Sequence, residues 1–209
     1  MIRVLIADDH QMFIDGLKSL LERESGIEIT GSANNGTQAL ECIEAQKPDV
    51  VLLDINMPEM NGINTTALIR KKYPAVKVLI LTMYKTKGFI NGLTRTGAAG
   101  YILKNTSHSE LMEAIRTVAA GGTFFSKEVA ETLSDKKPRF EVHSDASLSK
   151  REIEIIREIA KGLTTKQIAE KLFISYYTIE THRKNILSKL QLTNTAEVIL
   201  YASQSGLLD

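Results

Sequence analysis

The chain has 209 residues and one cysteine, 43% of its residues are hydrophobic and 24% are charged, and its formal net charge is +1. This length suits one large domain or two small ones, and the hydrophobic fraction is high enough for a packed core, which excludes global disorder. One cysteine cannot form an internal disulfide or a cysteine-rich zinc site, and the near-neutral charge excludes a wholly basic nucleic-acid binder. The longest apolar run, residues 198–202, is far shorter than the roughly 20 residues that span a bilayer. Since Asp8 and Asp9 also come too early for a signal peptide, we expect a soluble, cytoplasmic protein with no membrane partner.

Residues 2 to about 122 alternate short apolar runs with amphipathic stretches. The runs are rich in Val, Ile and Leu and mostly lack polar alternation, which is typical of parallel strands covered by helices on both faces. Such runs predict five strands, at 2–7, 27–33, 49–53, 77–81 and 99–103. The amphipathic stretches predict helices near 11–24, 36–46, 63–73, 86–96 and 107–120. The first part of the chain is therefore predicted to be an α/β domain with a doubly wound, five-stranded parallel sheet.

The pattern changes after residue 125, and no further strand is predicted. A short helix is expected within 126–134, and the polar, aperiodic segment 135–147 is typical of a linker. Four helices with short joints are predicted to follow, at 149–161, 164–172, 175–190 and 193–205. Each begins near a residue suited to capping, namely Ser149, Thr164, Ser175, and Thr193 or Asn194. We therefore expect a domain at 1–125, a short helix and linker at 126–147, and a small all-α four-helix domain at 148–209.

Polar residues follow four of the five predicted strands at the points where the strands end. Asp8 and Asp9 follow the first strand, Asp54 the third, Thr82 the fourth and Lys104 the fifth. Because the carboxyl ends of parallel strands meet at one edge of a sheet, we expect these side chains to converge. Clustered carboxylates repel one another unless a cation lies among them, and hard oxygen ligands suit Mg²⁺. An aspartate in such a cluster can accept a phosphoryl group, with the lysine and the hydroxyl opposite to receive it.

At these same positions the sequence resembles the receiver domain of two-component response regulators. The matching stretches are VLIADDH at 4–10, LLDINMPEMNG at 52–62, LILT at 79–82 and GYILK at 100–104. The resemblance implies a flavodoxin-like fold in which Asp54 accepts a phosphoryl group from a cognate histidine kinase. It also implies that Asp9, Asp54 and the backbone carbonyl of Asn56 bind Mg²⁺ directly, with Asp8 acting through water.

The resemblance further implies which residues respond to phosphorylation. Thr82 and Lys104 would contact the phosphoryl oxygens, and Thr82 and Tyr101 match the positions that switch conformation in the family. Asn105 follows Lys104 where many receivers have a proline, a departure that bears on how the lysine is held. Asn56 and Tyr84 occupy positions that tune the lifetime of the phosphoryl group in the family.

Residues 148–209 resemble the LuxR-type helix-turn-helix domain. The matching stretches are LSKRE at 148–152, IAKG at 159–162, KQIAEKL at 166–172 and TIETHRKNI at 178–186. A short helix, a tight joint and a second helix with a polar N-terminal half are also typical, on physical grounds, of a DNA-recognition motif. Together with the receiver, this domain indicates a response regulator of the NarL/FixJ type that binds a double-stranded DNA operator.

The second helix of this motif carries the predicted DNA contacts. Glu180, Thr181 and Lys184 are predicted to meet base edges, because their side chains match cytosine, thymine and guanine in the major groove. Tyr177 lies on the same polar face. Phosphate contacts, which position the protein without reading sequence, are predicted for Tyr176, Thr178, Arg183 and Lys189.

The sequence thus predicts a DNA-binding transcription factor rather than an enzyme. Phosphorylation of Asp54 is expected to change the surface of the fourth and fifth β-α units, to favour a homodimer and to alter operator binding, with RNA polymerase as a further partner. Two alternatives stay open. A Mg²⁺-dependent phosphatase with an aspartyl nucleophile needs a second carboxylate close by, whereas Ile55, Asn56 and Met57 follow Asp54. A regulator that binds DNA independently of phosphorylation would not need the intact set of acidic, hydroxyl and lysine residues.

Overall fold

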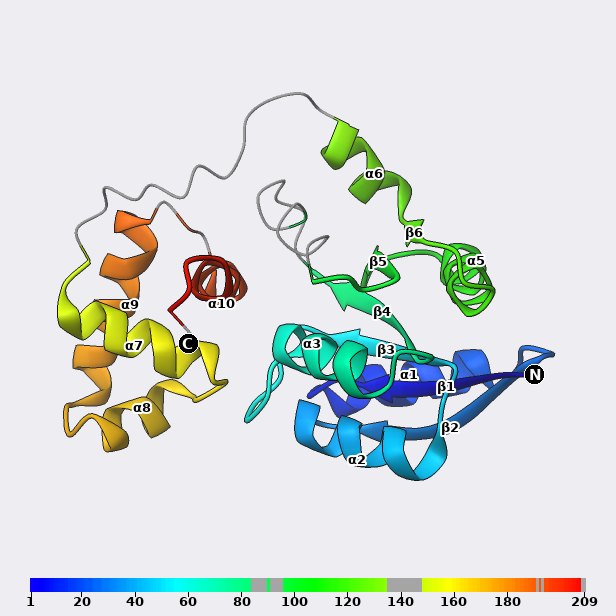
Figure 1. Cartoon of the computed structure of the whole chain (residues 1–209), viewed down its shortest axis with the longest axis horizontal. Helices are drawn as coiled ribbons and strands as arrows, with labels where there is room; N and C mark the ends of the chain where they lie inside the picture. The colour runs from blue at the N-terminus through cyan, green and yellow to red at the C-terminus, as the bar shows by residue number, and fades with distance from the viewer. Residues whose placement is uncertain (84–89, 91–95, 135–147, 191, 193, 208–209) are drawn as a thin grey trace. The chain divides into compact units, whose positions relative to one another are not determined.

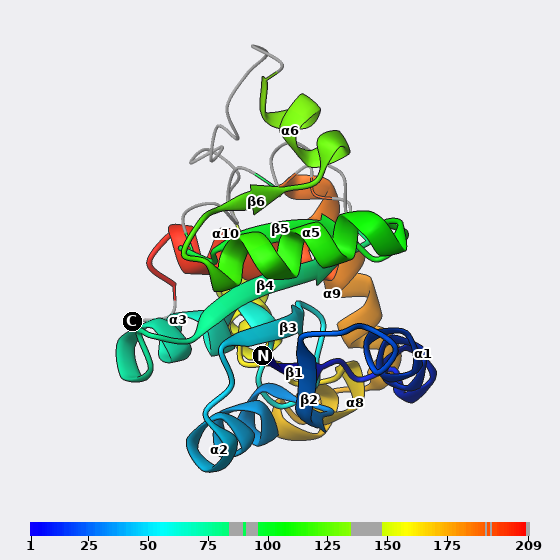
Figure 2. The same cartoon turned by 90° about the vertical axis from the view of Figure 1, so that its right-hand side faces the viewer.

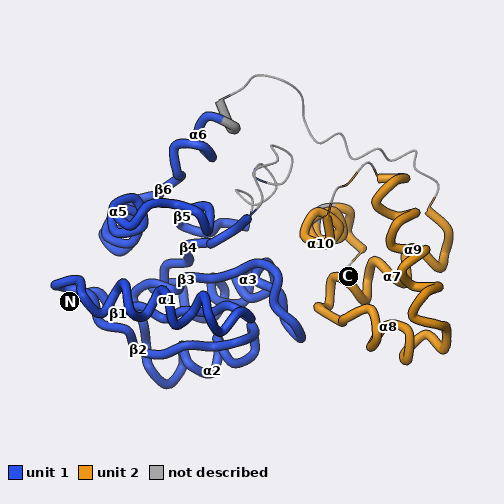
Figure 3. Tube along the Cα trace, turned by 180° about the vertical axis from the view of Figure 1, so that it is seen from behind, with its two compact units in different colours: residues 1–136 blue, residues 137–209 orange. Residues whose placement is uncertain are grey.

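The computed structural model describes residues 1–83, 90, 96–134, 148–190, 192 and 194–207. It divides into two compact units, Met1–Lys136 and Lys137–Asp209 (Figure 3). The linker predicted at 135–147 lies outside the described residues. So does the helix predicted at 86–96, except for two of its residues. Within the described parts of the chain, no helix is long and apolar enough to cross a membrane.

The first unit is built on a parallel sheet with the strand order β2-β1-β3-β4-β5-β6 (Figure 1). The strands are β1 (Ile2–Ala7), β2 (Ile27–Ala33), β3 (Val50–Asp54), β4 (Lys77–Thr82), β5 (Gly100–Leu103) and β6 (Phe124–Phe125). All five predicted strands are present, but the predicted number of five is wrong. β6 pairs with β5, so that Gly100 lies opposite Phe124. A two-residue strand is too short to give a periodic signal, and only its pairing with β5 makes it a strand.

Helices cover both faces of this sheet, which confirms the doubly wound fold (Figure 2). α1 (Gln11–Leu21) and α5 (His108–Ala119) lie on one face, whereas α2 (Gly36–Gln46) and α3 (Gly62–Lys72) lie on the other. Under α1 and α5, Ile14 and Ile115 are fully buried against strand residues such as Leu52. Burial of each such side chain stabilises the fold by about 1.5–3 kcal/mol. The strand order reverses between β1 and β3, and this is where a ligand crevice forms in sheets of this kind.

The described residues of the second unit form four helices, as predicted. They are α7 (Lys150–Ala160), α8 (Thr165–Lys171), α9 (Tyr176–Lys189) and α10 (Thr195–Gln204), and α6 (Lys127–Ser134) precedes them in the first unit. Ser149 and Thr164 form capping boxes at the starts of α7 and α8. Of the two predicted caps of α10, Asn194 is the one used: its Oδ1 accepts a hydrogen bond of 2.9 Å from the backbone N–H of Glu197. The side-chain caps therefore set the helix starts that the sequence predicted.

A small apolar core joins α7, α8, α9 and α10. Ile155, Ile168, Ile179 and Ile186 have no exposed surface. The joint between α8 and α9 is tight, because Phe173 adopts a left-handed backbone conformation with φ of 54°. Phe173 is 94% exposed, so the conformation is imposed by the turn rather than by packing of the side chain. The two helices are thereby held as a helix-turn-helix pair.

Candidate functional site

The carboxyl ends of β1, β3, β4 and β5 meet at one edge of the sheet and bring the predicted polar residues together. Asp8 has no exposed surface, Asp54 is 5% exposed and Thr82 is 1% exposed. Asp9 is more exposed than these three residues, with 33% of its side chain accessible to solvent. Strand pairing places these ends side by side, since Ala7 lies opposite Leu53 and Asp54 opposite Leu81.

Lys104 bridges the two buried carboxylates. Its Nζ lies 2.6 Å from Oδ2 of Asp8 and 3.1 Å from Oδ1 of Asp54. Its backbone N–H donates a 2.8 Å hydrogen bond to the carbonyl oxygen of Thr82, which fixes β5 beside β4 at this edge. One ammonium group therefore neutralises part of the negative charge of two carboxylates that come from separate strands.

The pKa values of Asp54 and Lys104 follow from their burial and from the charges around them. Burial raises the pKa of Asp54 to about 6; the Lys104 ammonium opposes this rise and the Asp8 carboxylate adds to it. For Lys104, burial lowers the pKa, but the carboxylates of Asp54 and Asp8 outweigh burial, so the net direction is upward. The lysine is therefore charged at neutral pH, and Asp54 titrates close to that range.

His10 also contacts the cluster, although no role was predicted for it there. Its Nδ1 lies 2.9 Å from Oδ1 of Asp9 and 3.1 Å from Oδ1 of Asp8, and its backbone N–H donates to Asp8 Oδ1 at 2.9 Å. Ligand atoms of Asp8, Asp9 and His10 all lie within 4.8 Å of one another. Because the predominant donors are hard carboxylate oxygens, these residues could hold a divalent cation of the Mg²⁺ kind. Asn56 was predicted to contribute its carbonyl, and its backbone N–H donates to Asp54 Oδ2 at 3.2 Å.

Gly62 shapes the loop beneath Asp54 because only glycine fits there. A Cβ at this position would lie 2.1 Å from the carbonyl oxygen of Asp54 and 2.9 Å from the Cα of Ile55. The backbone N–H of Gly62 donates a 2.9 Å hydrogen bond to the carbonyl of Ile55. The start of α3 is thus pressed against the strand end that carries Asp54, which holds this carboxylate in place.

Tyr101, the predicted aromatic switch, points into the first unit. The residue is 1% exposed, its hydroxyl lies 2.9 Å from Oγ1 of Thr96, and its ring stacks on Phe125 with centroids 5.6 Å apart. Burial raises the pKa of Tyr101 to about 12, so its hydroxyl is protonated at neutral pH. Arg70 of α3 donates a 3.1 Å hydrogen bond to the carbonyl of Thr96. Thr96, which contacts the hydroxyl of Tyr101, is therefore also hydrogen-bonded to α3. No sequence pattern indicated this contact.

The helix α9 presents a polar face opposite its buried Ile179 and Ile186. Exposed predicted DNA-contact residues on this helix are Tyr176, Tyr177, Thr178, Thr181, Lys184 and Lys189, whereas Glu180 and Arg183 are half-buried. The exposed set follows helical spacing, so that Tyr177, Thr181 and Lys184 share one stripe. This stripe is the part of the predicted contact set that is both exposed and aligned on one face of α9.

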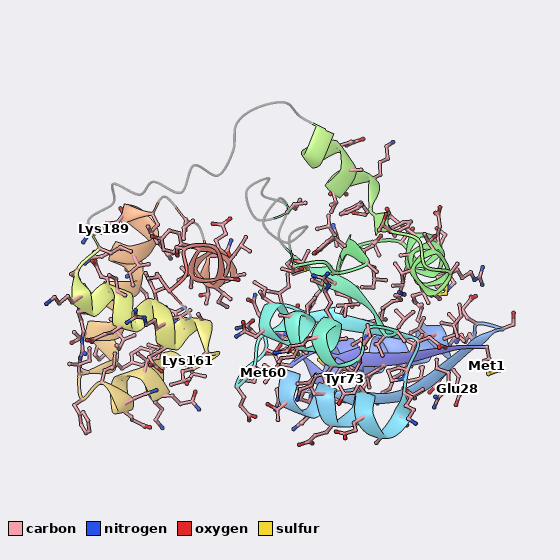
Figure 4. The ribbon with its side chains drawn as sticks, viewed as in Figure 1. Met1, Glu28, Met60, Tyr73, Lys161 and Lys189 are labelled. Atoms are coloured by element: carbon pink, nitrogen blue, oxygen red, sulfur yellow. The ribbon has the colours of Figure 1, made fainter. Side chains whose placement is uncertain are left out.

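Three of the predicted DNA-contact residues are engaged with other helices of the second unit. Glu180 Oε1 accepts a 3.0 Å hydrogen bond from the hydroxyl of Thr165, and Arg183 donates to Oγ1 of Thr195 at 2.6 Å. Lys189, near the C-terminal end of α9 (Figure 4), lies 2.8 Å from Oε2 of Glu152. Burial acts to raise the pKa of Glu152, but the contacts with Lys189 and Ser149 outweigh burial and lower it. These contacts tie α9 to α7, α8 and α10 and were not foreseen from the sequence.

The first unit is an α/β fold with two buried aspartates and a lysine at the carboxyl ends of its strands, and a helix-turn-helix unit follows it. This combination defines the class of two-component response regulators. Residues 4–116 match the family model described as response regulator receiver domain, and residues 146–202 match that of bacterial regulatory proteins, luxR family. The chain belongs to the NarL/FixJ-type response regulators, which join a receiver domain to a LuxR-type DNA-binding domain. This family consists of transcriptional regulators rather than enzymes.

Curated relatives and solved structures of the same organisation match nearly the full chain. The chain is 44% identical over 207 residues to the transcriptional regulatory protein MctR of Rhizobium johnstonii, covering 99% of this chain and 95% of that protein. It is 37% identical to the oxygen regulatory protein NreC of Staphylococcus haemolyticus, covering 99% of each. The response regulator ChrA of a heme-sensing two-component system has a TM-score of 0.56 at 36% identity, covering 99% of this chain and 98% of that one. RcsB from Salmonella enterica serovar Typhimurium, solved bound to the promoter rprA with phosphomimetic BeF₃⁻, has a TM-score of 0.62 at 25% identity, covering 98% and 100%.

Proposed function

We propose that Asp54 is the phosphoryl acceptor and that a cognate histidine kinase is the donor. An oxygen of the Asp54 carboxylate attacks the phosphorus of the kinase phosphohistidine, and a P–O bond forms as the P–N bond breaks. The bonding electron pair stays on the imidazole nitrogen, and the product is an acyl phosphate on Asp54. The observation that carries this proposal is the ammonium of Lys104, 3.1 Å from Asp54 Oδ1, where it can neutralise the incoming phosphoryl oxygens.

Mg²⁺ suits the same edge. The proposed ligands are the carboxylates of Asp9 and Asp54 and the backbone carbonyl of Asn56, with Asp8 acting through water. The donor set supports this assignment, because the three carboxyl groups of Asp8, Asp9 and Asp54 meet at this edge with the single ammonium of Lys104, which leaves an excess of acidic oxygen ligands. When bound, Mg²⁺ would supply further neutralisation of phosphoryl charge. Thr82, buried at the neighbouring strand end, is the proposed hydroxyl partner of the phosphoryl group, and Tyr101 is the proposed second switch residue.

We further propose the division into a receiver domain at 1–125, a short helix and linker at 126–147, and a DNA-binding domain at 148–209. Phosphorylation would change the surface of the fourth and fifth β-α units and favour a homodimer on DNA, with RNA polymerase as a further partner. A dimer places two recognition helices about 34–36 Å apart, one turn of the duplex. The structure of RcsB bound to promoter DNA with a phosphomimetic supports DNA binding by the phosphorylated form of the present chain. We place the protein in the cytoplasm, where a kinase, Mg²⁺ and DNA meet.

The proposal is tested by incubating the full chain with acetyl phosphate and Mg²⁺ and following both labelling and DNA protection. We expect a mass gain of one phosphoryl group on Asp54, together with a change in footprint on source DNA. Labelling without any change in footprint would instead support a regulator that binds DNA independently of phosphorylation. Steady hydrolysis of a phosphate ester over many turnovers would contradict the proposal and indicate a phosphatase.

Lys184→Ala is expected to weaken binding to the operator more than binding to random DNA. Lys184 is exposed on the same stripe of α9 as Tyr177 and Thr181, and a lost base contact costs about 1–3 kcal/mol of discrimination. The measurement is a pair of titrations, one with operator and one with random duplex, at the same salt concentration. Lys150→Ala, which removes an exposed lysine at the start of α7, is the matched control. Equal losses on both duplexes would make Lys184 a phosphate contact.

A further inference from the structure

Lys104 has a third neighbour besides its two carboxylates. Its Nζ lies 4.7 Å from the centroid of the Phe13 ring, a distance at which the face of an aromatic ring attracts a cation. Only 10% of the lysine side chain is exposed, so water does not compete freely for the ammonium. The ammonium is therefore enclosed by two carboxylates and one ring.

Phe13 reaches this position from the first turn of α1. The backbone N–H of Phe13 donates a 3.0 Å hydrogen bond to the carbonyl of His10, the residue that follows Asp8 and Asp9. The helix that carries the ring thus starts directly after the carboxylates of β1. Phe13 and Lys104 also line one cavity of about 310 Å³ between α1, β5 and α5, so open space adjoins both the ring and the lysine. Without the ring, the lysine could turn out of the acidic cluster into the cavity.

We propose that Phe13 is a positioning residue for Lys104 in phosphoryl transfer. The ring restricts the ammonium to the position between Asp8 and Asp54, from which it meets the incoming phosphoryl group. Two facts make such a restraint necessary: lysine has four rotatable side-chain bonds, and Asn105 follows it instead of the rigid proline found in many receivers. This inference rests on the proposed function of Asp54 as phosphoryl acceptor.

The test compares Phe13→Leu, which keeps apolar bulk but removes the ring, with Phe13→Tyr, which keeps the ring. Each full-length variant is labelled with acetyl phosphate over a range of donor and Mg²⁺ concentrations. We expect Phe13→Leu to lower the rate at saturating donor by about tenfold, which is within the range of a desolvated cation–π contact, without changing the half-saturating donor concentration. Phe13→Tyr should restore the rate. Leu20→Met, seven residues further along α1 and lining the same cavity, is the control for packing.

A second readout does not depend on turnover. In the unaltered protein, the ring current of Phe13 should shift the NMR signals of the Lys104 Cε protons upfield, and Phe13→Leu should abolish this shift while Phe13→Tyr preserves it. A Phe13→Leu rate within twofold of the unaltered protein, or an unchanged lysine signal, would overturn the inference alone. Failure of the unaltered protein to be labelled would overturn the proposed function, and this inference with it.

Discussion

Asp54→Asn is expected to abolish phosphoryl acceptance and, in the absence of metal, to stabilise the first unit above pH 6. Burial holds the pKa of Asp54 at about 6, above its value of roughly 4 in an unfolded chain, so the folded state disfavours the ionised carboxylate. The resulting penalty is absent below pH 4, grows as the pH rises to 6 and is complete above it. Asparagine is neutral at every pH and escapes this penalty. Since the variant also loses the contact with Lys104, we expect a net gain of about 1–2 kcal/mol at pH 8.

The measurement is urea unfolding in EDTA at pH 4 and pH 8, with amide exchange of the β3 strand to assign the transition to the first unit. Asp15→Asn removes an exposed carboxylate from α1 and serves as the matched control, for which no pH-dependent gain is expected. A gain at pH 4 equal to that at pH 8 would contradict the assigned pKa. Labelling of Asp54→Asn by acetyl phosphate would contradict the assigned acceptor.

Gly62→Ala and Gly16→Ala should change stability in opposite directions, although both add one methyl group at a helical position. At Gly62 the new Cβ would meet the carbonyl oxygen of Asp54 at 2.1 Å, and backbone atoms cannot move aside without displacing the strand end. We expect a loss of about 3 kcal/mol in the free energy of unfolding, together with slower labelling, because the displaced strand carries Asp54, the proposed acceptor. At Gly16, inside α1, a Cβ meets nothing within 4 Å. Alanine there should stabilise the fold by about 1 kcal/mol.

The midpoints of urea unfolding of the two variants decide this comparison, provided that the m-value is the same for both. If Gly62→Ala unfolds the first unit outright at room temperature, the same variant at low temperature should show the displacement as altered amide exchange in β3. If Gly62→Ala leaves the free energy of unfolding unchanged, the loop after Asp54 can shift at little cost. That result would remove the proposed role of α3 in holding the carboxylate.

The sequence was most informative where a signal repeats along the chain. Apolar runs located β1 and β2 with their observed ends, and capping residues such as Ser149 located the starts of the C-terminal helices. The convergence of Asp8, Asp54 and Lys104 was also predictable, because the topology of a parallel sheet fixes where strand ends meet. β6 was missed, because two residues carry no period and its pairing with β5 arises only in the folded chain.

Contacts between elements were beyond the reach of the sequence, because they depend on helix placement and on rotamers. Nothing in the residue pattern indicated that Thr165 would donate to Glu180, or that Lys189 would pair with the buried Glu152. Helical spacing identified a polar face on α9, but spacing cannot separate a side chain directed at DNA from one directed at a neighbouring helix. The ring of Phe13 over Lys104 was invisible for the same reason, since the two residues are distant in the chain.

The wide spacing of the site along the chain has a consequence for biosynthesis. Asp8 emerges from the ribosome early, whereas Lys104, its counterion at 2.6 Å, follows only after most of the first unit has been made. At roughly 5–20 residues per second, the delay is on the order of 5–20 s. During this interval the carboxylates of Asp8 and Asp54 lack the Lys104 ammonium that bridges them in the folded unit. A nascent or truncated chain that ends before β5 therefore lacks the cation of the cluster, and the DNA-binding unit is translated only after this cluster has all its charged groups.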